Sequence, residues 1–389
     1  MCLKASLNSY ITAIILLINL LKKGYKYMKT HLLFIGNKFI YNKSLQEYII
    51  RQIEKKTDFI NSITYFKEND NSLFLYLEKE LNLSDKLLII TTKQHFSTIG
   101  KVICTVTSDN QILKDNMLIP SKVDIFEDSS YLLDYKNTII NVLHVDEMQN
   151  MPEILLNFQD SKATIHLFEE DKQSASVLLS SISQTYDVNV DIVTLIEGWL
   201  QIDVSSNKYG NISKFISSAK QLFPKKLISV PCISSYIIEA LSIRNKKISF
   251  AESCTGGFLT YFFTKTNGSS KILDGSLVTY SNIMKENWLG VNTQTLKEFG
   301  AVSNEVVAEM SDGAMNVSEA DYTISISGIA GDTGATVSKP IGTIYIGIRT
   351  KTENKEIRLN LNGDRNYVQY QSVLYAVKML ILIDKDVFF

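Results

Sequence analysis

Short apolar runs that alternate with helical stretches are the feature that most constrains the fold of this chain. Near its start, apolar runs at His31–Gly36 and Asp85–Thr91 are separated by helical patterns at Ser44–Lys55 and Leu73–Leu81. Strands that alternate with helices favour a parallel sheet. We therefore predict an α/β protein whose first domain spans residues 28–141.

The next stretch, residues 142–224, has a different pattern. We expect strands at 163–168, 188–194 and 200–205 and a helix at 173–182, which together make a small α+β module. No side chains in this module suggest chemistry.

The composition changes beyond residue 224. Pro224 and Pro231 mark the junction, because proline disfavours continued regular structure. Thirteen of the eighteen glycines lie after residue 250, and glycine is used where the backbone turns tightly or approaches a ligand. We predict a third domain at residues 225–389, with a mixed sheet that helices cover on both faces. The expected elements are helix 234–244, strand 247–252, helix 255–265, strand 275–280, helices 283–289, 293–298 and 304–317, strands 322–327, 342–350 and 355–361, and helix 364–382.

The charges exclude one large class of partner. With 40 basic and 41 acidic residues among 389, the chain lacks the basic excess of nucleic-acid-binding proteins, so we expect no nucleic-acid partner. Cys2, Cys104, Cys232 and Cys254 show no spacing typical of a disulfide framework or a zinc site. We therefore expect a cytoplasmic protein with no bound metal.

Residues 1–27 contain an apolar run, Ile11–Leu21, with lysines on both sides. The run is shorter than the roughly 20 residues that span a bilayer. No small-residue cleavage site follows it, as one would in a signal peptide. We expect Met28 to be the native start, with residues 1–27 a non-native apolar leader, and a peripheral amphipathic helix is the alternative.

The sharpest motif is AESCTGG at residues 251–257, where a predicted strand ends and a helix begins. Free N–H groups at a helix N-terminus, beside two glycines, can bind a phosphate. The same turn can present the Ser253 hydroxyl to a substrate, as in serine hydrolases. A third interpretation is that Ser253 or Thr255 only caps the helix. The residues alone leave all three open.

Further motifs follow along the chain. In VTYSN, residues 278–282, a serine or asparagine cap puts Lys285 in the first helical turn, where the helix dipole disfavours a cation. Residues 323–331 run from an apolar strand into a glycine loop that offers backbone N–H donors. The runs at 339–343 and 363–365 are weak alone, and Arg365 suits either a phosphate or solvent.

The distribution of histidines narrows the chemistry further. All four lie before residue 224, so neither a Ser-His-Asp arrangement nor a two-histidine metal site can form within the third domain. A serine nucleophile there would need a lysine, tyrosine or carboxylate as its base. A lysine can serve only if burial or a nearby cation lowers its pKa towards neutrality.

In order and spacing, these motifs resemble the CinA C-terminal domain. The resemblance covers about Val230–Leu382 and rests on AESCTGG, VTYSN with Lys285, GAVS at 300–303, SGIAG, KPIGT and GDR. It implies a three-layer α/β/α domain with the family's nicotinamide-nucleotide amidase activity. That activity converts nicotinamide mononucleotide to nicotinate mononucleotide and ammonia in NAD salvage, the pyridine nucleotide cycle. The resemblance implies no cofactor.

The resemblance also assigns residues. Ser253 matches the family's catalytic serine, Lys285 its partner lysine and Tyr280 the tyrosine of its substrate pocket. Ser327 stands where many relatives have threonine, and Asp332 stands where they have proline, which affects loop rigidity more than chemistry. Substrate contacts are expected from Cys254, Thr255, Gly256, Gly257, Ser327, Gly328, Gly331 and Arg365.

The implied reaction uses these residues in turn. A neutral Lys285 would take the proton of Ser253, which attacks the carboxamide carbon. The N–H groups near Cys254 or the 328–331 loop would hold the oxyanion. The phosphate would rest on Thr255–Gly257 or near Arg365, and Tyr280 would stack on the pyridinium ring. A catalytically inactive protein that binds a nucleotide or a partner is the alternative.

Residues 28–141 resemble, less strongly, the MoaB-like domain of full-length CinA proteins. Relatives carry Gly-Thr-Glu after the first strand and a glycine-rich loop with aspartates after the second. Here the corresponding turns are Gly36-Asn37-Lys38 and Thr91–Ser97, which lack those glycines and carboxylates. We therefore expect a degenerate scaffold used for dimerisation, and a homodimer. A pyrophosphatase formed by this half is the third, disfavoured hypothesis.

Overall fold

The computed structural model describes residues 30–56, 60–81, 84–156, 162–206, 209–331 and 333–389. The chain divides into two compact units between residues 159 and 160. The predicted leader, residues 1–27, and Asp332 lie outside the described residues. In the part described, no helix combines the length and apolar character needed to cross a membrane.

The first unit contains a six-stranded sheet in the order β2-β1-β3-β8-β7-β6. Strands β2, β1, β3 and β8 run parallel, whereas β7 is antiparallel to both of its neighbours. The predicted parallel α/β arrangement is therefore confirmed. The strands are β1 (Thr30–Ile35), β2 (Ser62–Phe66), β3 (Lys86–Thr91), β6 (Ile125–Glu127), β7 (Ser130–Tyr135) and β8 (Thr138–His144), with a separate hairpin of β4 (Gln111–Lys114) and β5 (Met117–Pro120).

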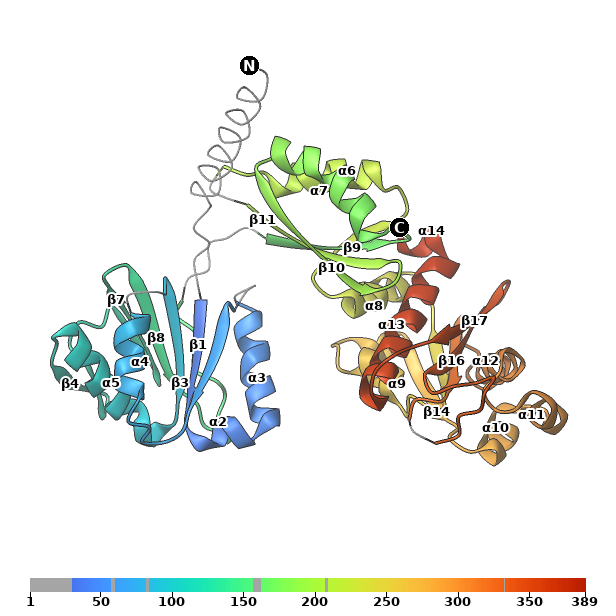
Figure 1. Ribbon diagram of the computed structural model, residues 1–389, viewed down its shortest axis with the longest axis horizontal. Helices are drawn as coiled ribbons and strands as arrows, with labels where there is room; N and C mark the ends of the chain where they lie inside the picture. The colour runs from blue at the N-terminus through green and yellow to red at the C-terminus, as the bar shows by residue number, and fades with distance from the viewer. Residues whose placement is uncertain (1–29, 57–59, 82–83, 157–161, 207–208, 332) are drawn as a thin grey trace, which may run out of the picture. The chain divides into compact units, whose positions relative to one another are not determined.

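Helices cover both faces of this sheet, because β1 and β3 are buried along their whole length. Side chains of α4 (Leu73–Glu80) and α5 (Lys93–Thr107) fill the core on one face, and those of α2 (Asn37–Tyr41) and α3 (Lys43–Glu54) fill it on the other. Figure 1 shows α3 and α5 on opposite sides of β1 and β3.

The first unit extends beyond the predicted boundary at residues 141 and 142. That boundary falls inside β8, which pairs with β3 and β7. The strand is difficult to recognise in the sequence because the polar residue Asn141, in its middle, interrupts the apolar run. The Asn141 side chain is fully buried and donates to Ser130 Oγ at 3.0 Å and to the Tyr131 carbonyl at 2.9 Å. These bonds satisfy an amide that would otherwise be costly to bury.

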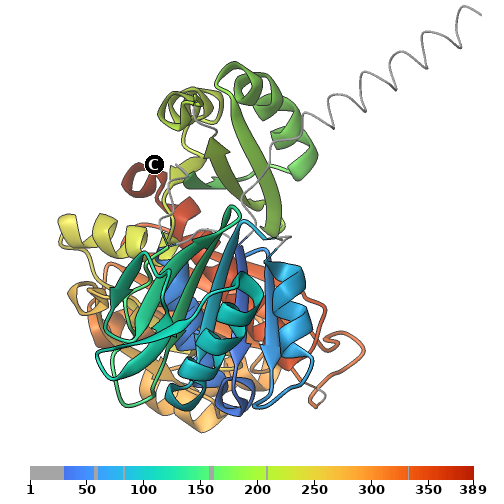
Figure 2. The same cartoon turned by 90° about the vertical axis from the view of Figure 1, so that its left-hand side faces the viewer.

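The second unit begins with an α+β module of the order β-α-β-β-α-β, the split βαβ arrangement of ferredoxin-like folds. Its antiparallel sheet has the order β10-β11-β9-β12. The two helices cover one face of the sheet (Figure 2). The elements are β9 (Lys162–Phe168), α6 (Lys172–Thr185), β10 (Val188–Ile196), β11 (Trp199–Ser206), α7 (Ile212–Leu222) and β12 (Leu227–Ser229).

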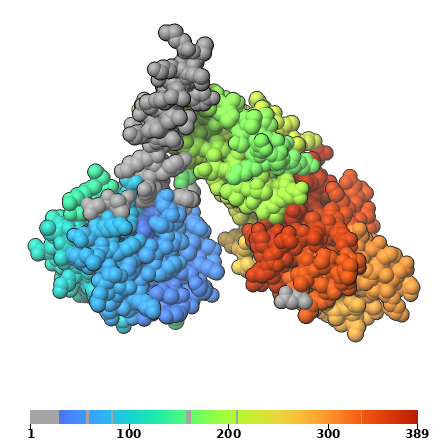
Figure 3. All heavy atoms as spheres, viewed as in Figure 1, coloured from blue at the N-terminus to red at the C-terminus, as the bar shows by residue number. Residues whose placement is uncertain are grey.

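The junction predicted near Pro224 does not separate two independent cores. Strand β12 follows Pro224 in the chain but pairs with β9 of the module. On the other face of the module's sheet, Phe168 and Trp199 belong to the same hydrophobic cluster as Phe388 near the C-terminus. Residues 160–389 therefore form one packed unit, in which the C-terminal segment, red in Figure 3, lies beside the green module.

The remainder of the second unit forms the predicted three-layer α/β/α arrangement. The sheet has the order β14-β13-β15-β16-β17, with β14, β13 and β15 parallel and the other two strands antiparallel. One face packs against α8, α9 and α13, and the other against α10, α11 and α12. The strands are β13 (Ile248–Glu252), β14 (Leu273–Val278), β15 (Tyr322–Gly328), β16 (Thr343–Thr350) and β17 (Asn354–Asn360), and the helices are α8 (Ile233–Ile243), α9 (Phe258–Thr264), α10 (Asn282–Leu289), α11 (Thr293–Phe299), α12 (Asn304–Ser318), α13 (Arg365–Ile383) and α14 (Lys385–Phe388).

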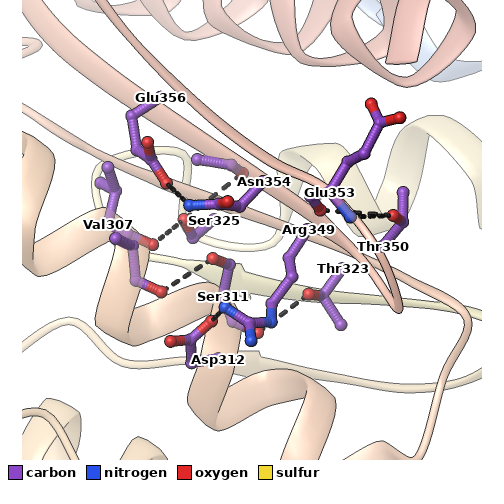
Figure 4. Close-up of polar contacts among 12 residues, drawn as sticks. Val307, Ser311, Asp312, Thr323, Ser325, Arg349, Thr350, Glu353, Asn354 and Glu356 are labelled. Atoms are coloured by element: carbon purple, nitrogen blue, oxygen red, sulfur yellow. Dashed lines mark hydrogen bonds and ion pairs between the residues drawn. The ribbon is translucent and has the colours of Figure 1, made fainter.

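Polar contacts fix α12 on the sheet (Figure 4). The Thr323 hydroxyl donates to the Ser311 carbonyl at 2.8 Å, and the Ser325 hydroxyl donates to the Val307 carbonyl at 2.5 Å. Arg349 of β16 forms an ion pair with Asp312 of α12. Small hydroxyl side chains on β15 therefore let the helix approach closely, so α12 is a firm support for the elements packed on it.

Candidate active site

The AESCTGG motif forms a five-residue turn between β13 and α9. The strand ends at Glu252, and the helix begins at Phe258 rather than at the predicted Thr255. Gly256 and Gly257 have φ angles of 59° and 99°, a left-handed region that disfavours other residues. No heavy atom lies within 4 Å of the position that a Cβ on Gly256 would take, so there is open space beside the turn.

The carboxylate of Glu252 occupies the N-terminus of α9. Its Oε2 accepts from the backbone N–H groups of Gly257 and Leu259, each at 3.0 Å, and its Oε1 accepts from the backbone N–H and the hydroxyl of Thr260. Glu252 itself is fully buried. An anion at a helix N-terminus is stabilised by the free N–H groups and the helix dipole.

This occupation corrects two interpretations of the sequence. Neither Ser253 nor Thr255 caps α9, because the N-cap is Gly257 and the donors of the first turn point to Glu252. The N–H of Gly257 is therefore not free for the phosphate that was predicted on Thr255–Gly257. Gly256 is also engaged, since its N–H donates to the Ser253 carbonyl at 3.1 Å.

The structure brings Ser253 and Lys285 together. The Nζ of Lys285 lies 2.9 Å from Ser253 Oγ and donates to the carbonyl of Thr279 at 2.6 Å. Both side chains are closed off from solvent, with Lys285 1% and Ser253 8% exposed. A nucleophile and its base must lie within this hydrogen-bonding distance for proton transfer.

Burial also adjusts the lysine for such a role. Desolvation by burial lowers the pKa of Lys285 from an ordinary 10.5 to about 8. The neighbouring Cys254 acts in the opposite direction, with a smaller effect. The Cys254 thiol is no anionic partner near neutral pH, because burial raises its pKa to about 12. A neutral amine beside a serine hydroxyl is therefore accessible at physiological pH, since no carboxylate among the described residues contacts the lysine and holds its proton.

Close packing places Lys285 at this position. The Ser281 hydroxyl accepts from Met284 N and caps α10, so Lys285 falls in the first turns of the helix, as predicted. At the other end of α10, a Cβ on Gly313 of α12 would lie only 1.9 Å from the Leu289 carbonyl oxygen. Only a glycine permits this approach, and it sets how deeply α10 inserts its lysine towards β13.

Tyr280, which follows Thr279 in the chain, contacts Arg365. The guanidinium of Arg365 donates to the Tyr280 hydroxyl at 3.0 Å. A Cβ added to Gly331 would lie 2.8 Å from Arg365 Nη1, so the glycine loop passes directly under the arginine. Both side chains are exposed, Tyr280 at 63%. In the part of the chain that the structure describes, no carboxylate pairs with Arg365, which leaves a cation facing solvent beside the site.

Ser327 and Gly328 pack against other parts of the protein instead of facing open space. The Ser327 hydroxyl is buried and donates to the Ala301 carbonyl at 2.7 Å, which joins β15 to the GAVS motif. A Cβ on Gly328 would lie 2.3 Å from the Ile344 side chain, so that glycine allows β15 and β16 to approach. These two predicted substrate contacts are thus engaged within the protein in this structure.

Two backbone donors next to the serine have no backbone acceptor. Among the described residues, no carbonyl accepts from the N–H of Cys254 or of Thr255. The turn that carries them is held from two sides, because Ser253 N donates to the Ile326 carbonyl and Gln369 Nε2 donates to the Cys254 carbonyl at 2.7 Å. Free N–H groups following a nucleophile can stabilise an oxyanion.

Three residues of the site, Glu252, Thr279 and Gln369, were not among those predicted from the sequence. Glu252 carries a signal that was available, because an acidic residue just before a glycine-marked helix start is a common helix cap. The carbonyl of Thr279 and the amide of Gln369 act through backbone geometry and through contact between distant segments. No spacing in the sequence marks such contacts.

The corresponding edge of the first unit has a different arrangement. The Thr92 hydroxyl is within 2.8 Å of His95 Nδ1, and Lys38 pairs with Glu147 at 2.7 Å. Within the described ranges, no group of three or more histidine, cysteine, aspartate or glutamate side chains gathers in a way that could hold a metal ion. The MoaB-like likeness of this unit stays a prediction.

Comparisons with known proteins place the site residues in a recognised domain. The family model of the CinA C-terminal domain matches residues 232–383. A CinA-like protein of Endomicrobium trichonymphae is 44% identical over 141 residues, which are 36% of this chain and 33% of that protein. A CinA-like protein of Thermotoga maritima is 42% identical over 144 residues, which are 37% of this chain and 35% of that protein. The match thus spans about a third of the length of these relatives.

Solved structures match the same region. The competence/damage inducible protein CihA of Agrobacterium tumefaciens is 32% identical, and the match covers 39% of this chain and 93% of that one, with a TM-score of 0.39. The competence damage-inducible protein A of Klebsiella pneumoniae is also 32% identical, with coverages of 38% and 92% and a TM-score of 0.37.

Proposed function

The chain belongs to the CinA family, and from that premise we propose that its C-terminal domain hydrolyses the carboxamide of nicotinamide mononucleotide. The products are nicotinate mononucleotide and ammonia. The observation that carries the proposal is the buried contact of 2.9 Å between Lys285 Nζ and Ser253 Oγ. A pure binding site has no need for a desolvated amine against a serine hydroxyl.

The first half of the reaction forms an acyl-enzyme. Neutral Lys285 takes the proton of Ser253 while Oγ attacks the carboxamide carbon. The free N–H groups of Cys254 and Thr255 stabilise the negative charge on the carbonyl oxygen, and one such donor contributes about 100- to 1000-fold to the rate. Lys285 then gives its proton to the amide nitrogen, the C–N bond breaks, and ammonia leaves.

The second half reverses these roles with water. Lys285, neutral again, takes a proton from a water molecule that attacks the ester carbon. The ester bond breaks, the proton returns to Ser253, and the carboxylate product leaves. The Thr279 carbonyl accepts from Lys285 throughout, so it keeps the amine oriented in both protonation states.

We propose that the phosphate of the substrate binds at Arg365. The alternative position, the N-terminus of α9, already holds the Glu252 carboxylate, which would repel a second anion. Arg365 faces solvent, and among the described residues its guanidinium bonds only to the Tyr280 hydroxyl. A planar guanidinium is well suited to a phosphate, and the exposed Tyr280 ring can stack on the pyridinium.

The remaining parts of the proposal concern the whole protein. We place it in the cytoplasm, in NAD salvage, as a homodimer with the MoaB-like first unit as a non-catalytic scaffold. Neither the sheet edge at Thr91–Ser97 nor the turn at residues 36–38 offers the glycine loop or the carboxylates that pyrophosphate chemistry would use.

One assay tests the proposed activity. Ammonia release from nicotinamide mononucleotide is measured for wild type, Ser253→Ala, Lys285→Ala and, as a control, Lys297→Ala on the exposed surface of α11. We expect an active wild type and control, with both dyad variants at least about 1000-fold slower. A folded but inactive wild type would support the alternative, a binding protein without catalysis. Activity that survives both dyad changes would remove the dyad.

A second assay tests the phosphate position. Arg365→Gln is expected to raise the KM for nicotinamide mononucleotide about tenfold while kcat changes little, because the contact serves ground state and transition state alike. The nucleoside, which lacks the phosphate, should be hydrolysed equally by wild type and variant. An unchanged KM for the nucleotide would move the phosphate elsewhere.

A further inference from the structure

Two buried threonine hydroxyls near the dyad have no hydrogen-bond partner. Thr255 is 2% exposed and Thr279 is fully buried, and neither Oγ1 finds a donor or acceptor among the described residues. Comparable threonines of the same domain are satisfied, since Thr323 donates to Ser311 O at 2.8 Å and Thr343 donates to Pro340 O at 2.7 Å. Buried polar groups of native proteins are rarely left unpaired, so each exception calls for a reason.

The two hydroxyls lie on the two halves of the dyad. Thr255 follows Ser253 by two residues in the same turn and adds its own free N–H to that of Cys254. Thr279 touches the other half, because its carbonyl accepts from Lys285 Nζ at 2.6 Å. Its N–H donates to the Glu252 carbonyl at 2.8 Å, which ties it to the strand that leads into the serine turn.

Both hydroxyls raise the free energy of the resting protein for no gain within it. A buried hydroxyl without a partner has lost its hydrogen bonds to water. Catalytic hydrogen bonds are often open in a resting enzyme and close only in the substrate complex. The missing partner is therefore best supplied by the group that reacts at Ser253.

Resting on the proposed function, we propose that Thr255 and Thr279 are substrate-binding residues that recognise the carboxamide itself. The Thr279 hydroxyl accepts a hydrogen bond from the amide nitrogen, and the Thr255 hydroxyl donates one to the carbonyl oxygen. We assign the Thr279 hydroxyl to the amide nitrogen because the Thr279 carbonyl holds the Lys285 amine, and that amine must reach the nitrogen to protonate it. Thr255 belongs to the oxygen because it shares the turn with the free N–H donors.

The proposal separates amides from esters. A carboxylic ester keeps the carbonyl oxygen but has no N–H to donate to Thr279. Hence Thr279 contributes to selectivity for the amide, whereas Thr255 contributes to both substrates. A hydroxyl with only a structural role would make no such distinction.

The experiment uses the full chain with Thr255→Val and Thr279→Val, and Thr323→Val as the matched control for a buried threonine that has a partner. Valine keeps the shape and removes the hydroxyl. For each variant we measure Tm, kcat for nicotinamide mononucleotide, and the rate of Ser253 acylation by p-nitrophenyl acetate, read by mass spectrometry.

We expect a distinct pattern for each variant. Thr279→Val slows the amide reaction at least about tenfold and leaves ester acylation within twofold. Thr255→Val slows both reactions, by about 100-fold, the size found for a lost oxyanion donor. Neither lowers Tm, because no bond of the resting protein is lost, whereas Thr323→Val lowers Tm by about 2–4 °C with unchanged rates.

Other outcomes overturn the inference. Unchanged rates in Thr255→Val and Thr279→Val, or a fall in Tm equal to that of Thr323→Val, would make the hydroxyls structural. If wild type acylates with the ester but releases no ammonia from the nucleotide, the proposed function fails by itself. The threonines are then judged on the ester, where Thr255→Val must be slow and Thr279→Val must not, and any other result removes the proposal.

Discussion

Two strand-to-helix turns of this molecule, one in each unit, each follow a parallel strand inside a sheet and differ in length and in the capping of the helix. The β13–α9 turn of the second unit spans five residues, Ser253–Gly257, with two glycines in left-handed conformations. The β3–α5 turn of the first unit has a single residue, Thr92, between strand and helix. Each turn follows the carboxyl end of a parallel strand, the usual place for a ligand.

The N-termini of the two helices differ in their capping. In the first unit, the Thr92 hydroxyl bonds to the side chain of His95, at Nδ1, and makes no capping bond to the backbone of α5. In the second unit, Glu252 reaches past the turn and supplies the acceptor for α9. The cap therefore comes from outside the turn, and Ser253, Cys254 and Thr255 keep hydroxyl and N–H groups for other contacts.

The topology of a sheet therefore provides a position where a site can form. The length and the capping of the turn decide whether a site forms there. The short turn has a single polar side chain, and that side chain bonds to another side chain of its own helix. A longer turn, capped from elsewhere and bent by glycine, can hold a nucleophile beside free donors. The contrast between the two turns predicts three effects of decreasing size.

Removing the Glu252 carboxylate that caps α9 should be far more damaging than removing the Thr92 hydroxyl. Glu252→Ala leaves three backbone N–H groups at the start of α9 without their acceptor, and we expect the free energy of unfolding to fall by about 4 kcal/mol. Thr92→Ala, the control in the first unit, should cost about 1 kcal/mol. Urea unfolding of both variants measures the difference. Equal losses would mean that Glu252 is not the cap on which the turn depends.

The pH dependence of stability should reveal the buried lysine. The pKa of Lys285 is about 8 when folded, below the ordinary 10.5 expected when unfolded, so the unfolded chain binds the proton more strongly. Burial therefore costs stability below pH 8, and this cost disappears as pH rises from 8 to 10.5. The full change is on the order of 3 kcal/mol.

Lys285→Met provides the reference for this measurement, because other titrating groups cancel in the difference. Wild type should gain on the order of 3 kcal/mol relative to the variant between pH 7.5 and 10.5, measured by urea unfolding. The β3–α5 turn of the first unit, where Thr92 stands alone between strand and helix, has no such pair of lysine and serine. A difference that stays constant with pH would show an unshifted lysine and contradict the account.

Replacing a glycine of the serine turn should have the smallest effect on stability, and it should also lower kcat. Gly257→Ala places a Cβ at a φ of 99° and is expected to cost about 1–2 kcal/mol. Because Gly257 shares the turn with Ser253, kcat should also fall about tenfold. Gly268→Ala, at a φ of 87° away from the dyad, should cost similar stability without loss of rate. Equal kinetics for both variants would separate the turn from catalysis.

Much of this arrangement could be predicted because the elements follow local patterns. The strands and helices of the C-terminal domain end within a few residues of their predicted bounds, as at α12 and β15. The juxtaposition of Ser253 and Lys285 was expected only through the family resemblance. Composition and spacing alone left Ser253 as cap, phosphate ligand or nucleophile.

What could not be predicted depends on contacts between distant segments. Glu252 and Gln369 act on the serine turn through three-dimensional packing, and β8 is concealed by a buried Asn141 whose partners lie on β7. The boundary near Pro224 was misplaced for a related reason. Strand β12 is only three residues long, and its pairing with β9 shows only in the folded chain.

The most direct test of the central claim measures the base rather than the substrate. The rate at which phenylmethylsulfonyl fluoride modifies Ser253 is followed by mass spectrometry between pH 6 and 10, in wild type and in Lys285→Met. We predict that the wild-type rate rises with pH through a midpoint of about 8, the pKa of the buried amine, and that the variant lacks this rise. A wild-type rate that is flat across that range, or a variant that follows the same curve, would contradict the account.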